Sequence, residues 1–408
     1  MKKVLGMNKL YLDRLFPLKK TIPFVDKDII KVIIGQRRVG KSTFLLQIMD
    51  WIKKEDKKAH IIFINKELHE FDAIKTHVDL INFVKTQAKR GHKNYVFVDE
   101  VQDIEEFEKA LRSLLAEGKH DIFCSGSNAH LLSGELATYL SGRFVEIKVH
   151  SLSYQEFLTF HQLENNNESL LKYIKYGGLP FLKFVGLDDS ISYDYLRNVY
   201  STILLKDVTQ RFAIRNIAFL ESLVAFLADN IGFIVSAKKI SDFLISQRMK
   251  ISPNVVLNYL SYLAQAYFID RVPRFDIRGK KIFEIHEKCY FEDLGLRHAI
   301  TGYKQTEVSG VLENLIYHHL VVLGYKISVG QLGVKEIDFV CERGGERFYV
   351  QVAYSINEHS RDREFGNLMA IQDNFPKYVV SMDELIGSAS YQGITHLHVR
   401  DFLMRTKF

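Results

Sequence analysis

The first 150 residues alternate short apolar runs with segments of helical periodicity. The apolar runs are rich in β-branched residues and occupy positions 29–34, 59–65, 94–102, 121–128 and 144–149. Runs of this length and composition are typical of strands buried in a parallel sheet. The segment STFLLQIMDWI after the first run has the period of a helix. The pattern therefore predicts an α/β fold for this part of the chain.

The first strand leads into the loop Gly35-Gln36-Arg37-Arg38-Val39-Gly40-Lys41-Ser42-Thr43, which matches G-x-x-x-x-G-K-[ST]. Its place between a strand and a helix is the context that this phosphate-binding motif requires. The glycines let backbone N–H groups approach phosphates, and the helix N-terminus favours anions. We expect Lys41 to reach the β- and γ-phosphates and Ser42 to be a Mg²⁺ ligand. The sequence thus predicts ATP and Mg²⁺ as cofactors.

The third apolar run ends in Asp99-Glu100, the arrangement of a Walker B strand. We expect Asp99 to hold Mg²⁺ through water and Glu100 to polarise the attacking water. The fourth run ends in Ser127 and Asn128, either of which is a candidate to orient the water, although a simple Ser/Gly/Asn turn has equal weight. A strand between the two motifs, with a Glu after the Walker Asp, resembles the additional-strand P-loop ATPases.

Each of three arginines near these motifs has two alternative roles. Arg143, just before the fifth run, is a candidate catalytic finger on a neighbouring copy's nucleotide or a structural ion-pair partner. Arg37 and Arg38 either touch a partner or face water. A finger acting in trans would require a homo-oligomer.

The middle of the chain has two different patterns. Residues 165–235 are helical in pattern and predict a lid over the nucleotide. A helix, a turn, a second helix begun by Ser252 and Pro253, and a β-rich stretch then follow, which is winged-helix order. The second helix is expected to bury an apolar face, formed by Val256, Leu260, Leu263 and Tyr267. The opposite face is expected to be exposed and carries Asn254, Asn258, Ser261 and Gln265. Basic residues flank the helix in sequence: Arg248, Lys250, Arg271, Arg274, Arg278, Lys280 and Lys281. DNA contact, protein contact and simple packing remain open for this segment.

Residues 335–355, KEIDFVCERGGERFYVQVAYS, predict a β-hairpin that turns at Gly344-Gly345. A two-residue turn places Asp338 opposite Gln351 and keeps both on the face that also carries Ala353. The hairpin resembles the metal-binding hairpin of PD-(D/E)XK restriction-like nucleases, in which Asp faces Glu-x-Lys. Gln and Ala replace that Glu and Lys here. The hairpin therefore predicts a nuclease-like fold in which cleavage is absent.

A helix over 309–325 carries Glu313, which is expected to converge with the hairpin residues Asp338 and Gln351 in a vestigial nuclease site. Mg²⁺ prefers carboxylate ligands, and Gln351 supplies no charge. Lys335 and Lys326 lie nearby in the sequence and are candidates to replace the missing lysine. Alternation along the strand, however, places Lys335 on the opposite face.

The order of these motifs, with YGGLP at 176–180 and the closing QVAYS, resembles the bacterial and archaeal AAA-type ATPases of the AAA_14 group that end in a DUF4143 domain. The resemblance covers nearly the whole chain. It implies four domains: an AAA+ P-loop core (1–160), a helical lid (161–232), a winged-helix segment (233–305) and a nuclease-like domain (306–408). It implies ATP hydrolysis but no settled biological role.

The amino-acid composition bears on the class of protein, its compartment and its partners. A hydrophobic fraction of 47% with 25% charged residues is ordinary for a globular chain, and no apolar run is long enough to span a membrane. Three widely spaced cysteines predict neither a disulfide framework nor a zinc site, which favours the cytoplasm. The net charge of +6 permits a DNA partner without requiring one.

Three functions therefore remain open: an ATPase that acts on DNA, a nucleotide-gated switch that binds a protein partner, and an ATP-controlled nuclease. The first is favoured.

Overall fold

The structure is a computed structural model that describes residues 13–126, 142–304, 308–356, 358–383 and 390–408. The chain forms two compact units, Met1–His150 and Ser151–Phe408. Ser127 and Asn128, the candidates to orient the attacking water, lie outside the described residues.

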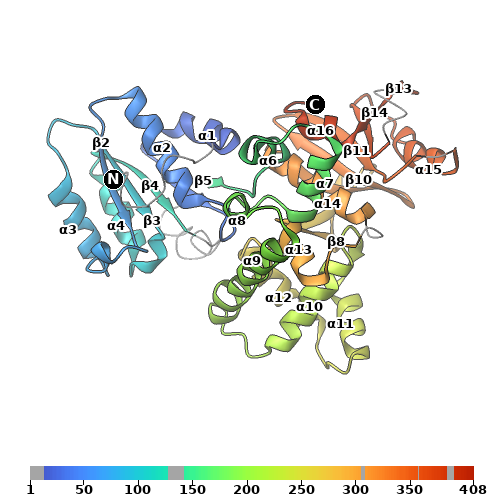
Figure 1. Ribbon diagram of the computed structural model, residues 1–408, viewed down its shortest axis with the longest axis horizontal. Coiled ribbons are helices and arrows are strands. Elements are labelled where there is room, and N and C mark those ends of the chain that lie inside the picture. Colours follow the sequence, from blue (N-terminus) through green and yellow to red (C-terminus); the bar gives the residue numbers. More distant parts are fainter. Residues whose placement is uncertain (1–12, 127–141, 305–307, 357, 384–389) are drawn as a thin grey trace. The chain divides into compact units, whose positions relative to one another are not determined.

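The first unit is built on a five-stranded sheet (Figure 1). Its strands are β1 (Ile30–Ile34), β2 (His60–Asn65), β3 (Asn94–Asp99), β4 (His120–Ser125) and β5 (Phe144–Lys148). They are ordered β2-β3-β4-β1-β5, and all the neighbouring pairs are parallel. The expected α/β fold is confirmed. The strand expected between the two motifs in the sequence is β2, at the edge of the sheet, and β4 separates β1 from β3 within the sheet.

Helices cover this sheet because their apolar residues recur on one face. The elements are α1 (Leu15–Thr21), α2 (Lys41–Glu55), α3 (His77–Gln87) and α4 (Phe107–Ala116), with short 3-10 turns η1 (Ile22–Phe24), η2 (His69–Phe71) and η3 (Val101–Asp103). Along α2, Phe44, Leu45, Ile48, Met49 and Ile52 are all buried at helical spacing. Helix α2 contacts β1, β3 and β4, and so the loop before it is held at one edge of the sheet.

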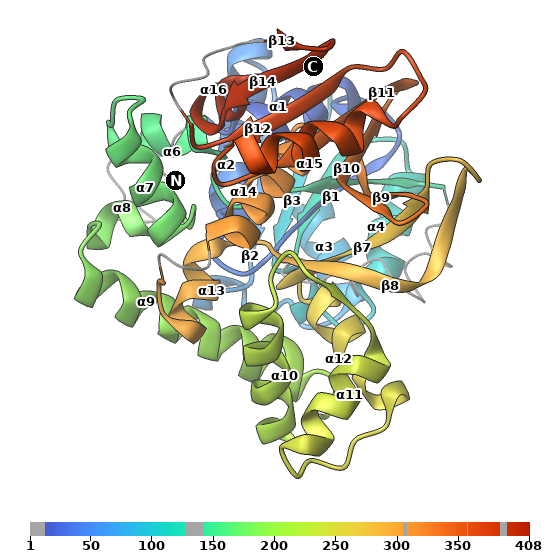
Figure 2. The ribbon, with the colours of Figure 1, turned by 90° about the vertical axis from the view of Figure 1, so that its right-hand side faces the viewer.

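The second unit begins with helices: α6 (Tyr154–His161), α7 (Asn167–Tyr176), α8 (Leu182–Val185), α9 (Asp189–Thr202), a π-helix η5 (Ile203–Gln210) and α10 (Ile217–Asp229). Strand β6 (Ile234–Val235), helices α11 (Ala237–Ser246) and α12 (Pro253–Gln265), and the long hairpin of β7 (Ile269–Asp276) and β8 (Lys281–Phe291) follow. Figure 2 shows α10, α11 and α12 grouped at one end of this unit.

The expected faces of α12 are confirmed on its buried side. Val256, Leu260, Leu263 and Tyr267 are all buried, whereas Asn254 and Asn258 are exposed. Ser261 and Gln265 are half-buried and bond to each other, with Gln265 Nε2 donating to Ser261 Oγ.

The remaining elements are α13 (Leu294–Thr301), α14 (Val308–Val322), β9 (Lys326–Leu332), β10 (Lys335–Arg343), β11 (Glu346–Val352), α15 (Glu358–Met369), β12 (Lys377–Ser381), β13 (Ser390–Tyr391), β14 (Ile394–His398) and α16 (Val399–Met404). One sheet of order β13-β14-β12-β11-β10-β9-β7-β8-β6 runs through the unit. Because β7 pairs in parallel with β9, the hairpin after α12 and the C-terminal strands share this sheet. In the described part of the chain, no helix is both long and apolar enough to cross a membrane.

The predicted hairpin register is present. Gly344 and Gly345 turn with φ of 57° and 89°, and Arg343 pairs with Glu346 and Phe339 with Val350. The register of β10 against β9 shifts between Ile337 and Val340, which moves the residues around Asp338 out of regular alternation.

Candidate functional site

The loop between β1 and α2 has the backbone that a phosphate cradle needs. Gly35 and Gly40 have φ of 144° and 95°, and Gly40 is the N-cap residue just before α2. A Cβ on Gly35 would collide with the carbonyl oxygen of Val149, so glycine is required there for packing as well as for conformation. Lys41 is buried, and its ammonium donates to the carbonyl oxygens of Gly35 and Gln36, both at 3.0 Å.

Two side chains outside the motif hold the loop. The guanidinium of Arg14 donates to the carbonyl oxygen of Val39 at 3.0 Å and to that of His150 at 2.7 Å. The backbone N–H of Arg14 donates to Gln47 Oε1 on α2 at 3.0 Å. Sequence reasoning missed Arg14 because nothing in its local pattern points to a loop 25 residues away.

Asp99, at the end of β3, is fully buried beside the start of α2. The Ser125 hydroxyl, at the end of β4, donates to Asp99 Oδ1, and Asp99 Oδ2 is a buried oxygen with no hydrogen-bond partner among the described residues. Burial raises the pKa of Asp99, and hydrogen bonds from Ser125 and Ser42 oppose that rise. Ser42 and Asp99 thus meet, as the sequence predicted, and Ser125 was missed.

Glu100 follows directly and has a left-handed backbone, with φ 52° and ψ 54°. Its N–H donates to Ser125 Oγ at 3.2 Å, so the same hydroxyl orders both acids. Its carboxylate accepts a hydrogen bond from the side-chain amide of Gln102, in the turn η3. A non-glycine residue in this conformation is strained, and such strain is common at functional sites.

These residues fit a nucleotide and a divalent cation. The loop and the start of α2 offer backbone N–H groups to phosphates, and the unpartnered Asp99 Oδ2 is a hard oxygen of the kind that Mg²⁺ prefers. Both amide atoms of Gln36 are also buried without a hydrogen-bond partner in the described structure, inside the same loop. Buried polar atoms are costly when unsatisfied, so these positions favour a bound polar ligand.

Comparison with known proteins agrees with this geometry. Residues 27–158 match the family described as "AAA domain" (AAA_14), and residues 167–307 match a "Domain of unknown function (DUF8612)". An uncharacterized protein of Haemophilus influenzae is 35% identical over 405 residues, covering 98% of this chain and 100% of its own length. The chain belongs to this family of AAA-domain proteins.

Two further relatives extend the comparison. The uncharacterized protein MJ1544 of Methanocaldococcus jannaschii is 32% identical over 351 residues, which cover 82% of this chain and 77% of that protein. The solved structure of the Walker-type ATPase PABY2304 of Pyrococcus abyssi is 16% identical and covers 72% of this chain and 96% of that one, with a TM-score of 0.49. The family match over residues 27–158 shows the AAA domain. The DUF4143 part of the expected resemblance is not shown, because the second matching family is DUF8612.

The arginines of the AAA domain differ in their surroundings. Arg143 is exposed and precedes β5, whose first residue pairs with Ile30 at the start of β1. In a parallel sheet this is the amino edge, and the phosphate loop follows the carboxyl edge of β1. Arg143 therefore cannot reach the nucleotide of its own copy, and its role in trans stays a prediction. Arg38 is exposed with φ 71°, and Arg37 is half-buried.

In the second unit, the expected acids Glu313 and Asp338 do converge, on an ammonium that sequence reasoning missed. Lys288, on β8, has a side chain only 2% exposed, and its Nζ lies 2.7 Å from Glu313 Oε1 and 3.4 Å from Asp338 Oδ1. Glu336 Oε1 lies 2.8 Å from the same nitrogen. No local signal distinguishes Lys288, because it lies on a strand of the preceding segment.

The other hairpin residues have different surroundings. Gln351 Oε1 accepts from the N–H of Asp338 at 3.4 Å, a long hydrogen bond, and not from Lys288. Ala353 packs in an apolar cluster with Ile337, Tyr349 and Phe365. The expectation that Ala353 lines the acid site is therefore wrong, and a lysine there would be buried among apolar side chains. Lys335 instead donates to the carbonyl oxygen of Gly366 at 3.0 Å.

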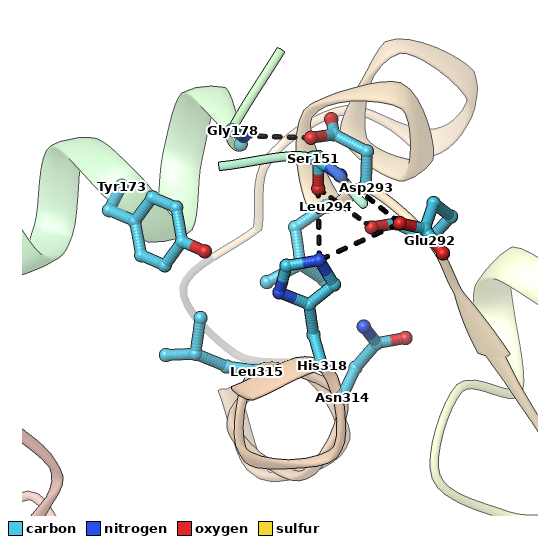
Figure 3. Close-up of a pocket in the computed structure, with 10 residues that line it drawn as sticks. Ser151, Tyr173, Gly178, Glu292, Asp293, Leu294, Asn314, Leu315 and His318 are labelled. Atoms are coloured by element: carbon cyan, nitrogen blue, oxygen red, sulfur yellow. Dashed lines mark hydrogen bonds and ion pairs between the residues drawn. The ribbon is translucent and has the colours of Figure 1, made fainter. Parts of the chain in front are cut away.

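A small cavity in the second unit is lined by residues of α7, α13 and α14 and of the loops around them (Figure 3). The Ser151 hydroxyl donates to the Glu292 carbonyl oxygen at 3.0 Å and is 3.1 Å from His318 Nε2. Glu292 Oε1 accepts from the N–H of Ser151 at 3.1 Å. The Ser151 hydroxyl therefore links the Glu292 backbone to the His318 ring within the second unit.

The YGGLP segment packs against this cluster of Ser151, Glu292 and His318. Asp293 begins α13, where its Oδ1 accepts from the N–H of Leu296 at 3.1 Å, and its Oδ2 accepts from the N–H of Gly178 at 2.7 Å. A Cβ on Gly177 would collide with the Asp293 carboxylate, and one on Gly178 with the carbonyl oxygen of Leu152. The two glycines of this motif are therefore explained by close backbone packing.

Proposed function

We propose that this protein binds and hydrolyses Mg²⁺-ATP in its AAA domain and couples hydrolysis to contact with DNA through its second unit. The observation that carries the first part is the convergence of Lys41, Ser42, Asp99 and Glu100 at one edge of the parallel sheet, with Ser125 linking the two acids.

Each residue has a distinct task in this proposal. Lys41 exchanges the carbonyl oxygens of Gly35 and Gln36 for phosphate oxygens of ATP, and residues 35–43 donate N–H groups to the phosphates. Ser42 and Asp99 would hold Mg²⁺, which neutralises phosphate charge when bound. Glu100 accepts the proton of the attacking water, once its carboxylate is released from the Gln102 amide.

The DNA part of the proposal rests on element order and exposed charge. Helix α10, strand β6, helices α11 and α12, and the β7–β8 hairpin follow one another as in a winged helix, and β6 pairs with β8. We define the basic surface of this segment by its exposed cations in the turn before α12 and in the hairpin turn: Arg248, Lys250, Arg278, Lys280 and Lys281. Among the described residues none of these five cations forms an ion pair, and exposed unpaired cations favour phosphate contact over base readout.

The flanking segments are proposed to have related roles. Helices α7 to α10 lie within residues 161–232, the segment proposed as the lid. Helix α14, strands β9 to β11, helix α15 and strands β12 and β14 support a nuclease-like fold for residues 306–408, with β10–β11 as an antiparallel hairpin and β11–β12–β14 parallel. Trans action of Arg143 would require a homo-oligomer.

The experiment that tests coupling combines binding and turnover. Duplex DNA labelled with a fluorophore is titrated with wild type and with the double variants Arg248→Ala/Lys250→Ala and Lys280→Ala/Lys281→Ala. We expect wild-type affinity to fall steeply with salt, each double variant to bind more weakly by about tenfold, and DNA to raise the ATPase rate of wild type only. Lys326→Ala/Lys407→Ala, which removes two exposed cations elsewhere, is the matched control. Equal binding by all variants, or a rate indifferent to DNA, would contradict the coupling.

A second candidate is a nucleotide-gated switch that binds a protein partner. Phe181 and Phe184 are 40% and 52% exposed, and their rings lie 5.6 Å apart. Exposed aromatic pairs of this kind favour protein contact. This candidate predicts ATP-dependent association with a protein partner that is lost in Phe181→Ser/Phe184→Ser, with no response to DNA.

A further inference from the structure

In the second unit, the carboxylates of Glu313, Glu336 and Asp338 surround the ammonium of Lys288. Lys288 Nζ donates hydrogen bonds to Glu313 at 2.7 Å and to Asp338 at 3.4 Å, and it forms an ion pair with Glu336 at 2.8 Å. Three elements, β8, α14 and β10, contribute these four side chains. The Tyr290 hydroxyl also donates to Glu313 Oε1, and the N–H of Val352 donates to Asp338 Oδ2 at 2.8 Å.

We propose that the Lys288 ammonium occupies the place of a divalent cation in this cluster, so that the native protein excludes such a cation from it. The ammonium contacts one oxygen of each carboxylate. Glu313 and Asp338 are both buried, so their carboxylates are not open toward solvent for a second cation. The cluster that the hairpin pattern suggested as a remnant metal site is thereby closed by a lysine of the same chain.

The pKa shifts of the cluster agree with an ammonium held among acids. Burial raises the pKa of both Glu313 and Asp338. Burial alone would lower the pKa of Lys288, but the carboxylates of Glu313, Asp338 and Glu336 outweigh it and raise that pKa. The Lys288 ammonium therefore stays charged, and the Glu336 side chain beside it is 41% exposed.

The position of Lys288 also argues against a metal ion bound in this cluster. A divalent cation at these oxygens would lie within a few ångströms of a fixed ammonium, and like charges at that distance repel strongly in a buried site. The position from which the hairpin pattern would supply a lysine, Ala353, is in an apolar cluster. The lysine from β8 therefore serves as a structural cation and not as a partner to a metal.

The test removes the ammonium and asks whether a metal takes its place. Wild type, Lys288→Met, Lys288→Arg and Lys288→Met/Asp338→Asn are titrated with Mn²⁺ in the absence of nucleotide, by electron paramagnetic resonance and thermal unfolding. Lys288→Met should gain one Mn²⁺ site that wild type and Lys288→Arg lack. At ten times its dissociation constant, Mn²⁺ should raise the Tm of Lys288→Met by about 3 °C, and the added Asp338→Asn should abolish the gain.

Two outcomes would overturn the inference. One is Mn²⁺ binding to wild type that Asp338→Asn removes, since the ammonium then excludes nothing. The other is a folded Lys288→Met that gains no site. If Lys288→Met does not fold, Lys288→Met/Glu313→Gln removes one of the two buried acids left without a counter-ion, and the wild-type and Asp338→Asn titrations still decide the first outcome. ATP hydrolysis plays no part in this test, so its result is independent of the proposed function.

Discussion

The Ser125 hydroxyl donates a hydrogen bond to the Asp99 carboxylate across neighbouring strands β4 and β3. The same oxygen accepts the N–H of Glu100 at 3.2 Å. One hydroxyl thus orients the proposed Mg²⁺ ligand and the backbone of the proposed base, and its loss should affect both.

Ser125→Ala should raise the Mg²⁺ concentration needed for half-maximal ATP hydrolysis by about tenfold, because a hydrogen bond to a charged group contributes ~1.5–3 kcal/mol. Ser125→Thr keeps the hydroxyl and should remain close to wild type. The measurement is the hydrolysis rate as a function of Mg²⁺ at saturating ATP. An unchanged Mg²⁺ dependence in Ser125→Ala would show that Asp99 does not depend on this bond.

Gln102→Ala should increase kcat by about tenfold with little change in KM. Its amide holds the Glu100 carboxylate and makes that oxygen a weaker proton acceptor, and a hydrogen bond to a charged group contributes ~1.5–3 kcal/mol. Gln102 Oε1 is buried without a hydrogen-bond partner in the described structure, so the native contact leaves the amide half satisfied. Steady-state kinetics of Gln102→Ala and Gln102→Asn beside Glu100→Gln separate the two roles. A fall in kcat as large as that of Glu100→Gln would mean that Gln102 supports the active position instead of restraining it.

Asp293→Asn should destabilise the second unit by ~1–3 kcal/mol, because an amide has one acceptor oxygen and the carboxylate uses two. Denaturant unfolding of the full chain measures the change. Asp188→Asn is the matched control: Asp188 also caps a helix, α9, but is exposed, and its replacement should cost less. Equal costs for the two variants would show that the contact with Gly178 contributes nothing.

His319 should make the second unit sensitive to acid. Burial lowers the pKa of His319 from 6.5 to about 3, and its Nε2 donates to the carbonyl oxygen of Arg405 at 3.0 Å. Between these two pH values the unfolded chain binds a proton that the folded chain does not. The free energy of unfolding therefore falls as pH decreases through this window, by up to about 1.4 kcal/mol per pH unit.

His319→Gln keeps a donor and removes the titration. Its free energy of unfolding should depend less on pH between 6.5 and 3 than that of wild type. Parallel pH profiles for the two proteins would contradict this origin of acid sensitivity.

Local patterns were enough to predict the first unit. The phosphate loop, the strand ending at Asp99 and the inserted strand all follow from short motifs in which each residue type has a fixed physical task. The hairpin at Gly344-Gly345 was predictable for the same reason, since positive φ favours glycine at both positions.

Long-range contacts were not predictable in this way. Lys288 meets Glu313 and Asp338 from 25 and 50 positions away, on a strand with no motif. The shift of register after Ile337 also removes the strict alternation on which the placement of Ala353 depended. Arg14, Ser125 and Gln102 were missed because their tasks are set by the fold and not by their neighbours in sequence.

The central claim is that Lys41 and Glu100 carry out Mg²⁺-dependent ATP hydrolysis. Phosphate release should be measured for wild type, Lys41→Ala and Glu100→Gln with saturating ATP, with and without Mg²⁺. The account predicts turnover by wild type only with Mg²⁺, loss of ATP binding in Lys41→Ala, and retained binding without turnover in Glu100→Gln. Turnover by Glu100→Gln at the wild-type rate, or no Mg²⁺-dependent turnover by wild type, would contradict it.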